Sequence, residues 1–89
     1  MTLFKLGSIV ATQGALQLCK QHKIDPLSLV DRHAAGDWGD LCAEDVQSNA
    51  EALATIGRVL SSYVIQGDKL YVITEWDRSA TTLLLANEY

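Results

Sequence analysis

The sequence is short of several residue types that specialised classes of protein need. Its 89 residues include only two cysteines, Cys19 and Cys42, and a single proline, Pro26. No signal sequence is recognisable at the start, so we expect two reduced thiols rather than a secreted, disulfide-bonded scaffold. The longest apolar runs fall far short of the ~18 residues needed to span a bilayer. We therefore expect a cytoplasmic protein that does not associate with a membrane.

Basic residues are also scarce. Seven Lys and Arg stand against eleven Asp and Glu, which gives a net charge of −4. Proteins that bind DNA or RNA through phosphate groups carry clustered Lys and Arg. The one local basic cluster, Lys20–Lys23, is typical of the last turn of a helix, where cations are favourable. The charge balance therefore argues against direct binding of nucleic acid.

The length and composition indicate one small globular domain over residues 1–89. Hydrophobic residues make up 48% of the chain and charged residues 20%, which are ordinary values for a folded protein. A chain of this length buries a smaller share of its surface than a larger domain does, so its margin of stability is thin. A protein partner or a homodimer is therefore expected more than for a larger protein.

Three helices are predicted from their start and stop residues, over residues 12–22, 26–35 and 43–56. Asp25 before Pro26, with Gly36 just beyond the end, gives the clearest of these signals. In the third helix, apolar and amide residues recur at i, i+3, i+4 and i+7, which predicts an inward stripe. The stripe consists of Val46, Asn49, Ala50 and Leu53.

Strands are predicted over residues 3–11, 58–65, 69–75 and 81–85, where β-branched and aromatic residues are frequent. Gln66-Gly67-Asp68 and Asp77-Arg78-Ser79 supply the two turns of a meander. The first strand is expected to join the same sheet, because its backbone groups need partners. The sequence thus predicts an α+β fold of order β-α-α-α-β-β-β, with a mostly antiparallel sheet and helices on one face.

The loop Gly36-Asp37-Trp38-Gly39-Asp40 is the most unusual local sequence. Its glycines permit backbone angles closed to other residues, and a large aromatic lies beside a carboxylate between them. One interpretation makes Trp38 a plug at the end of the core, with Asp37 capping the next segment. The other makes the loop a recognition surface, because Trp is enriched at binding hot spots. The burial of Trp38 separates the two.

Two polar residues are expected on inward helix faces. His33 shares a face with Leu29 and Val30, which is typical of a hydrogen-bonded structural histidine and less often of a functional one. Asn49 needs partners if it is buried, and we expect them in the Gly36–Asp40 loop or at the start of a strand. Convergence of the helices and loop would gather four candidate binding residues: His33, Asp37, Asp45 and Asn49. The chain has no His pair at i, i+4, no close Cys pair and no HExxH, so neither a metal nor another cofactor is expected.

A second polar cluster lies at a strand–turn–strand junction. It supplies four further candidate binding residues: Glu75, Trp76, Asp77 and Arg78. Asp77 before Arg78 and Ser79 is typical of a turn, and Glu75 with Arg78 can form a surface ion pair. In a functional alternative, Glu75 or Asp77 would pair with His33 as general acid and base.

The consecutive residues Leu83, Leu84 and Leu85 predict a strand that is covered on both faces. A small domain has too few elements to cover both faces of its sheet. Either the strand twists so that one leucine meets the ends of the helices, or the outer face carries an apolar patch that binds a second subunit. We expect the second, a homodimer across the open face in which Tyr63, Tyr71 and Ile73 join the leucines.

Several of these motifs occur together in one family. They are His33-x-x-Gly36-Asp37-Trp38-Gly39, then Asp45, Asn49 and Ala52-Leu53, then Ile73-Thr74-Glu75-x-Asp77-Arg78-Ser79-x-Thr81-Thr82-x-Leu84-Leu85-x-x-Glu88-Tyr89. In this pattern the chain resembles short bacterial proteins carried on plasmids and integrative elements, often labelled "plasmid-related protein" or "type I restriction endonuclease subunit M". The methylase label does not fit, since such an enzyme needs an Asn-Pro-Pro-Tyr/Phe motif and a Rossmann-like sheet. The resemblance therefore implies a genomic setting and not a reaction.

Three function classes follow from these observations. The leading hypothesis is a non-enzymatic accessory protein of mobile genetic elements that binds another protein, with host restriction or CRISPR systems as candidate targets. The first alternative is a small hydrolase or nuclease that uses His33 with Asp37, Asp45 and Asp77, and with Glu75. The second is a structural subunit of a larger assembly.

Overall fold

The computed structural model describes residues 2–89, in which three α-helices lie between a first strand and three later ones. The elements are β1 (Ser8–Ala11), α1 (Gln13–Gln21), α2 (Pro26–Ala34), α3 (Ala43–Ala54), β2 (Val59–Ile65), β3 (Asp68–Thr74), β4 (Ala80–Leu85) and the 3-10 turn η1 (Ala86–Glu88). The predicted α+β class and element order are confirmed.

α1 and α2 begin where side chains satisfy free backbone N–H groups of the first turn. The Oγ1 of Thr12 accepts from the backbone N–H of Ala15 at the start of α1, at 3.1 Å. The carboxylate of Asp25 accepts from Leu27 at the start of α2, at 3.0 Å, and Pro26 holds the first helical position. These local caps explain why the sequence predicted both starts.

The four strands form one mixed sheet in the order β1-β4-β3-β2. β3 pairs antiparallel with both β2 and β4, whereas β1 pairs parallel with β4. The predicted mostly antiparallel sheet and the predicted place of the first strand in it are both confirmed. Gln66 and Gly67 join β2 to β3 with positive φ angles of 49° and 87°, as a two-residue hairpin loop requires.

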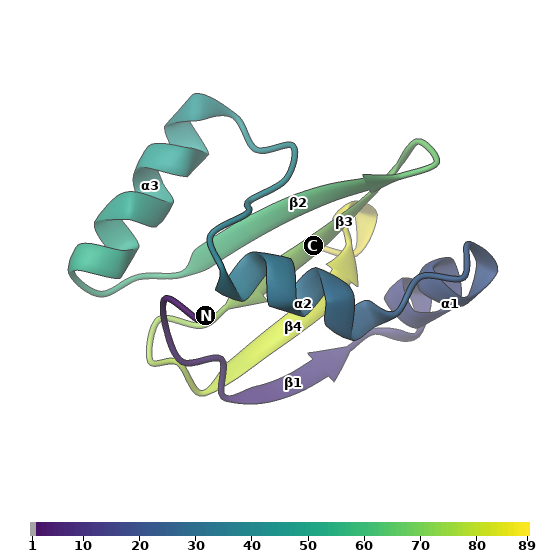
Figure 1. Cartoon of the computed structure of the whole chain (residues 1–89), viewed down its shortest axis with the longest axis horizontal. Helices are drawn as coiled ribbons and strands as arrows, with labels where there is room; N and C mark the ends of the chain where they lie inside the picture. Colours follow the sequence, from purple (N-terminus) through teal and green to yellow (C-terminus); the bar gives the residue numbers. More distant parts are fainter. Residues whose placement is uncertain (1) are drawn as a thin grey trace.

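The inner face of the sheet carries the hydrophobic core. Side chains alternate along each strand, so one set faces α1 and α2 and the other set forms the outer face. Figure 1 shows α2 crossing in front of the sheet and α1 at the end of it. The buried core residues are Ala15, Leu18, Cys19, Leu29, Val30, Tyr63, Ile65, Leu70, Val72 and Leu83.

The segment before β1 is not a strand. β1 begins at Ser8, so the prediction of a strand from Leu3 is wrong for residues 3–7. Instead the N–H of Leu3 donates to the carbonyl of Ala34, at 2.8 Å, and the chain runs over the inner core. Gly7 ends this N-terminal strap (residues 2–7) at φ +66°, where a Cβ would lie 2.3 Å from the carbonyl oxygen of Ser79.

α3 lies beside the edge strand β2 and not over the face of the sheet (Figure 1). Asn49 is fully buried there, and its carboxamide bonds both backbone groups of Leu60: the N–H at 2.9 Å and the carbonyl at 2.7 Å. The expected bond from Asn49 to the start of a strand is therefore confirmed. The rest of the predicted stripe is partly wrong, because Val46 and Ala50 are exposed and Ala52 is buried instead. A helix that packs at the edge of a sheet has only a narrow strip of its own surface buried, and in α3 this strip contains Asn49 and Ala52.

The backbone N–H and carbonyl of Ser62, the next residue of β2 that faces this edge, form hydrogen bonds with the loop before α3. The N–H of Ser62 donates to the carbonyl of Trp38 at 3.0 Å, and the N–H of Asp40 donates to the carbonyl of Ser62 at 2.6 Å. Together with Asn49 on Leu60, this loop satisfies the outward backbone groups of two alternate residues of β2.

Candidate functional site

His33 lies at the centre of a buried chain of hydrogen bonds that links four parts of the fold. Its side chain is fully buried on the inner face of α2. Nδ1 bonds the hydroxyl of Ser61 on β2, and Nε2 bonds the hydroxyl of Thr74 on β3 at 2.9 Å. The hydroxyl of Thr74 bonds that of Thr81 on β4 at 2.7 Å, and Thr81 donates to the carbonyl of Leu6 in the N-terminal strap at 2.7 Å.

The carbonyl of Leu6 at the end of this chain fixes the direction of the bonds from Thr81 as far as Nε2 of His33. The hydroxyl of Thr81 donates its one hydrogen to the carbonyl of Leu6, so the hydroxyl of Thr74 must donate to Thr81. Because Thr74 has only that one hydrogen to donate, it accepts from Nε2–H of His33. The network therefore requires a proton on Nε2 of His33. When the ring is neutral, Nδ1 accepts from the hydroxyl of Ser61.

Burial lowers the pKa of His33 to about 4, which agrees with a neutral ring at pH 7. Both ring nitrogens are already bonded, and neither is left for Asp37, Asp45, Glu75 or Asp77. The structural interpretation of His33 accounts for its position, and the general acid–base pairing proposed from the sequence receives no support from this geometry.

Trp38 is half-buried and closes the end of the core beside His33. Its ring stacks on Phe4 at a centroid distance of 6.3 Å and meets the His33 ring edge-on at 5.8 Å. Phe4 also packs edge-on against His33, at 5.2 Å. This arrangement matches the interpretation of Trp38 as a plug.

Asp37 has one partner on α2 and one in its own loop. It forms an ion pair with Arg32 at 2.7 Å and accepts from the N–H of Gly39 at 3.2 Å. The hydrogen bond from Arg32 holds the pKa of this carboxyl below its usual range. Its role is thus to hold the turn between α2 and α3.

Asp45 is exposed in the first turn of α3, where it accepts a hydrogen bond from the thiol of Cys42 at 3.2 Å. Asn49, one turn later, bonds Leu60. The four residues expected to converge therefore each have separate partners, and within residues 2–89 no group of three or more His, Cys, Asp or Glu gathers as metal ligands.

Arg78 has a structural role that the sequence did not suggest. Its guanidinium donates to the carbonyls of Gly57 and Ala52, the latter at 3.0 Å, and also to the carbonyl of Glu75 at 3.1 Å. Cations stabilise helix C-termini, and α3 has no basic residue in its own last turn. The absence of a basic residue from the last turn of α3 was the only sign in the sequence that a cation from another part of the chain would cap this helix.

The expected ion pair between Glu75 and Arg78 is not formed. The Glu75 carboxylate pairs instead with Arg58, at 3.2 Å. Asp77 accepts from the N–H of Ser79 at 3.0 Å, and hydrogen bonding by Ser79 lowers the pKa of Asp77. Asp77 therefore shapes its turn, as one interpretation of the sequence proposed.

Trp76 differs from the other candidates because its ring is exposed. It lies in the turn between β3 and β4 with 56% of its surface accessible. The turn beneath it is held by the bonds of Arg78 and Asp77, so an exposed indole projects from a well-supported backbone.

The expected dimer surface needs two corrections, because Tyr63 and Ile73 are both buried. Tyr63 alternates onto the inner face opposite Leu70, where it is buried, and its hydroxyl donates to the carbonyl of Asp37 at 2.6 Å. Arg32 lies over its ring, 4.5 Å from the centroid. Tyr71 and Ile73 alternate onto the outer face, but Ile73 is only 5% exposed, so of the three expected contact residues only Tyr71 is open to a second copy.

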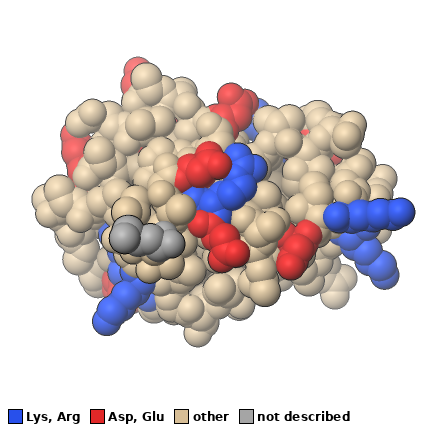
Figure 2. Space-filling model, in the orientation of Figure 1, with Lys and Arg blue, Asp and Glu red and all other residues tan. Residues whose placement is uncertain are grey.

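The visible charges are dispersed. On the face shown in Figure 2, Lys and Arg side chains are scattered among acidic and uncharged ones and form no continuous basic surface. No helix within residues 2–89 has the length and apolar character needed to cross a membrane. No family model matches the chain, and comparisons with curated proteins and solved structures give no match either. A functional assignment therefore rests on the geometry of this chain.

Proposed function

We propose that this protein is a non-enzymatic accessory protein of bacterial mobile genetic elements, acting in the cytoplasm by binding another protein. The observation that carries the proposal is the exposure of Trp76 on a supported turn. Tryptophan is enriched at the centres of protein interfaces, because it offers a large apolar ring and a hydrogen-bonding N–H. About half of the Trp76 surface is exposed to water, and a partner that covered this apolar ring would gain the free energy of burying it.

The support beneath Trp76 favours binding over mobility. Arg78 ties this turn to the end of α3, and Asp77 fixes its backbone. A residue that is already ordered loses little conformational entropy on binding, so more of its contact energy appears as affinity. The partner that fits this turn has an apolar cleft for the indole and a neutral or basic rim facing Asp77.

The proposed cellular setting comes from the family resemblance and not from the fold. Proteins of plasmids and integrative elements meet host restriction and CRISPR systems, so components of these systems are the partners to test first. A structural subunit of a larger assembly would use the same turn but would be recovered in a fixed ratio with its neighbours.

Affinity purification from a bacterial lysate with quantitative mass spectrometry tests the proposal. Wild type, Trp76→Ala and Leu27→Ala would be compared, because Leu27 is similarly exposed at 55% but lies on α2. We expect one protein to be enriched by wild type and by Leu27→Ala, and to be depleted at least about tenfold by Trp76→Ala.

Equal thermal midpoints of the three proteins would show that folding is not the cause. If no protein separates wild type from Trp76→Ala, the binding proposal is wrong. Transformation of an unmodified plasmid into a restriction-proficient host tests the setting separately. A failure to raise the transformation efficiency there would remove restriction as the target and leave the binding result intact.

A further inference from the structure

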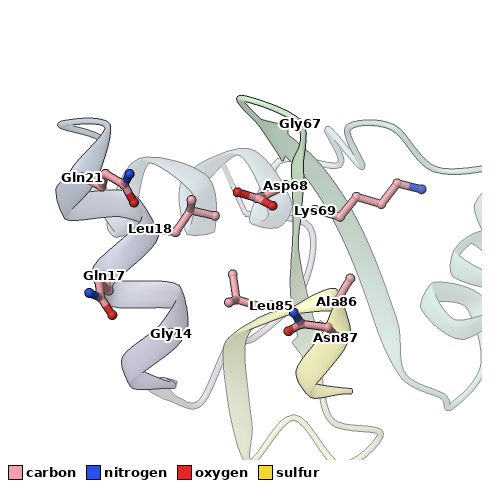
Figure 3. Close-up of a pocket in the computed structure, with 10 residues that line it drawn as sticks. All are labelled: Gly14, Gln17, Leu18, Gln21, Gly67, Asp68, Lys69, Leu85, Ala86 and Asn87. Atoms are coloured by element: carbon pink, nitrogen blue, oxygen red, sulfur yellow. The ribbon is translucent and has the colours of Figure 1, made fainter.

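A pocket of 380 Å³ opens at the end of the sheet that lies farthest along β3 from Trp76. Three separate parts of the chain enclose it: α1, the β2–β3 turn, and the junction of β4 with η1 (Figure 3). The side chains that matter for its chemistry are Gln17, Leu18, Gln21, Asp68, Leu85 and Asn87. None of them was among the candidate residues from the sequence.

The pocket presents one carboxylate. The Asp68 side chain points into the space between α1 and the hairpin, while the neighbouring Lys69 extends away from it (Figure 3). Lys69 also lines the pocket, but the ion pairs within residues 2–89 join Arg32 to Asp37 and Arg58 to Glu75, so Asp68 forms no salt bridge. The net charge of the chain, −4, also favours a positively charged ligand.

The remaining lining suits a cation carried on an apolar stem. Leu18 from α1 and Leu85 from β4 face the middle of the pocket near Asp68 (Figure 3). Gln17 and Gln21 lie one helical turn apart on α1, and Asn87 lies across from them on η1. Their amide oxygens are acceptors that can complete the hydrogen bonding of a group with several N–H donors.

An anion is disfavoured, although the pocket reaches the first turn of α1. Helix N-termini attract anions, but here the carboxylate of Glu88 already occupies that position. It accepts from the Thr12 hydroxyl at 2.7 Å and from the N–H of Leu85 at 2.8 Å, and it approaches Gly14 closely. An anion bound here would be repelled by the carboxylates of both Glu88 and Asp68.

We propose that this pocket binds an arginine side chain presented by another polypeptide. The planar guanidinium would pair with Asp68 and donate its other N–H groups to the surrounding amides, while the alkyl stem packs on Leu18 and Leu85. Arginine fits better than lysine because its five donors match a carboxylate together with several amide oxygens. The pocket and Trp76 lie at opposite ends of β3, so this site does not depend on the proposed role of Trp76.

Titration of the intact ¹⁵N-labelled protein followed by NMR tests this site directly. The probe is N-acetyl-arginine amide, and the matched control is N-acetyl-citrulline amide, which has nearly the same shape without the charge. We expect saturable shifts in the backbone amides of Gly67 and Asp68 and in the side-chain amides of Gln17, Gln21 and Asn87. Binding of the citrulline compound should be at least about tenfold weaker.

Asp68→Asn should weaken arginine binding by a similar factor, and it leaves a residue that is well suited to a turn. Asp31→Asn removes a surface carboxylate on α2, outside the pocket, and should leave the affinity unchanged. The inference fails if no saturable shift appears up to roughly 50 mM probe. It fails equally if citrulline matches arginine, or if Asp68→Asn binds as wild type does.

Discussion

A single side chain, that of Asn49, satisfies both outward backbone groups of Leu60. Asn49→Ala removes a donor and an acceptor at once and leaves two part-buried backbone groups unpaired. We expect the free energy of unfolding to fall by about 1–3 kcal/mol. Urea denaturation of both proteins measures the difference.

Asn49→Asp sharpens this test because aspartate has nearly the same shape but cannot donate to the Leu60 carbonyl when ionised. It should be at least as destabilised as the alanine variant at neutral pH. Gln47→Ala is the control, since Gln47 is exposed on the same helix and should change stability by no more than about 0.5 kcal/mol. Equal stability of wild type and Asn49→Ala would contradict the role assigned to the carboxamide.

At the scale of elements, α3 is the least embedded helix, and Arg78 holds its C-terminal end. Lysine keeps the charge of Arg78 but cannot reach the carbonyls of Gly57 and Ala52 together with that of Glu75. We expect Arg78→Lys to lower the free energy of unfolding by about 1–3 kcal/mol. Amide hydrogen exchange in the last turn of α3 should accelerate more than exchange in α2.

Arg58→Lys provides the comparison for that experiment. Arg58 belongs to an exposed ion pair with Glu75, and such pairs contribute about 0–1 kcal/mol. If the two lysine variants behave alike, then Arg78 is a surface residue in solution and does not cap α3.

The elements that the sequence predicted are those specified by neighbouring residues. Asp25 and Pro26 determine the start of α2 through contacts within three residues, and the turn at Gly67 needs only its own backbone angles. The N-terminal strap was predicted as a strand because its residues suit one. Its actual course depends on Ala34, Ser79 and the buried rings, which only the folded chain brings near.

The candidate site divides in the same way. The inward positions of His33 and Asn49 follow from helix periodicity, whereas their partners lie 28 and 11 residues away on β2. Arg78 bonds backbone carbonyls, which every residue has, so no residue type in the sequence identifies its partners. The pocket at Asp68 is formed by three segments distant in sequence, so no local pattern predicts it.

At the scale of the whole molecule, stability should depend on the protonation of His33. Its pKa is about 4 in the folded protein and 6.5 in a free side chain. Above pH 6.5 the ring is neutral in both states and its full contribution is present. As the pH falls from 6.5 to 4, His33 becomes protonated in the unfolded chain but stays neutral in the folded protein. Protonation therefore favours the unfolded state, and the free energy of unfolding falls. The total loss is about 3 kcal/mol.

Urea denaturation at several pH values between 7.5 and 4 measures this dependence. His33→Gln lacks the titrating ring and should be less stable than wild type at neutral pH but show a flatter decline below it. A decline of the same steepness in both proteins would mean that other groups control the acid response.

The outer face of the sheet is where we expect two copies of the chain to meet. Tyr71 and Leu84 are only half-covered there, Val10 is 50% exposed, and Tyr89 packs edge-on against Tyr71. Sedimentation at micromolar concentration should give twice the chain mass, and Leu84→Glu should restore the monomer. A concentration-independent monomer mass for wild type would rule out this homodimer.

The closure of β2 by α3 and its preceding loop also affects how the protein behaves when it is crowded or stressed. An open strand edge is a template on which other chains can add strands and grow into cross-β fibrils. Here the peptide groups of Leu60 and Ser62 are already occupied, by Asn49 and by the loop at Trp38 and Asp40. Strand addition at Leu60 and Ser62 must therefore wait until α3 and the loop detach, so the helix with the fewest buried residues helps to protect this edge from aggregation.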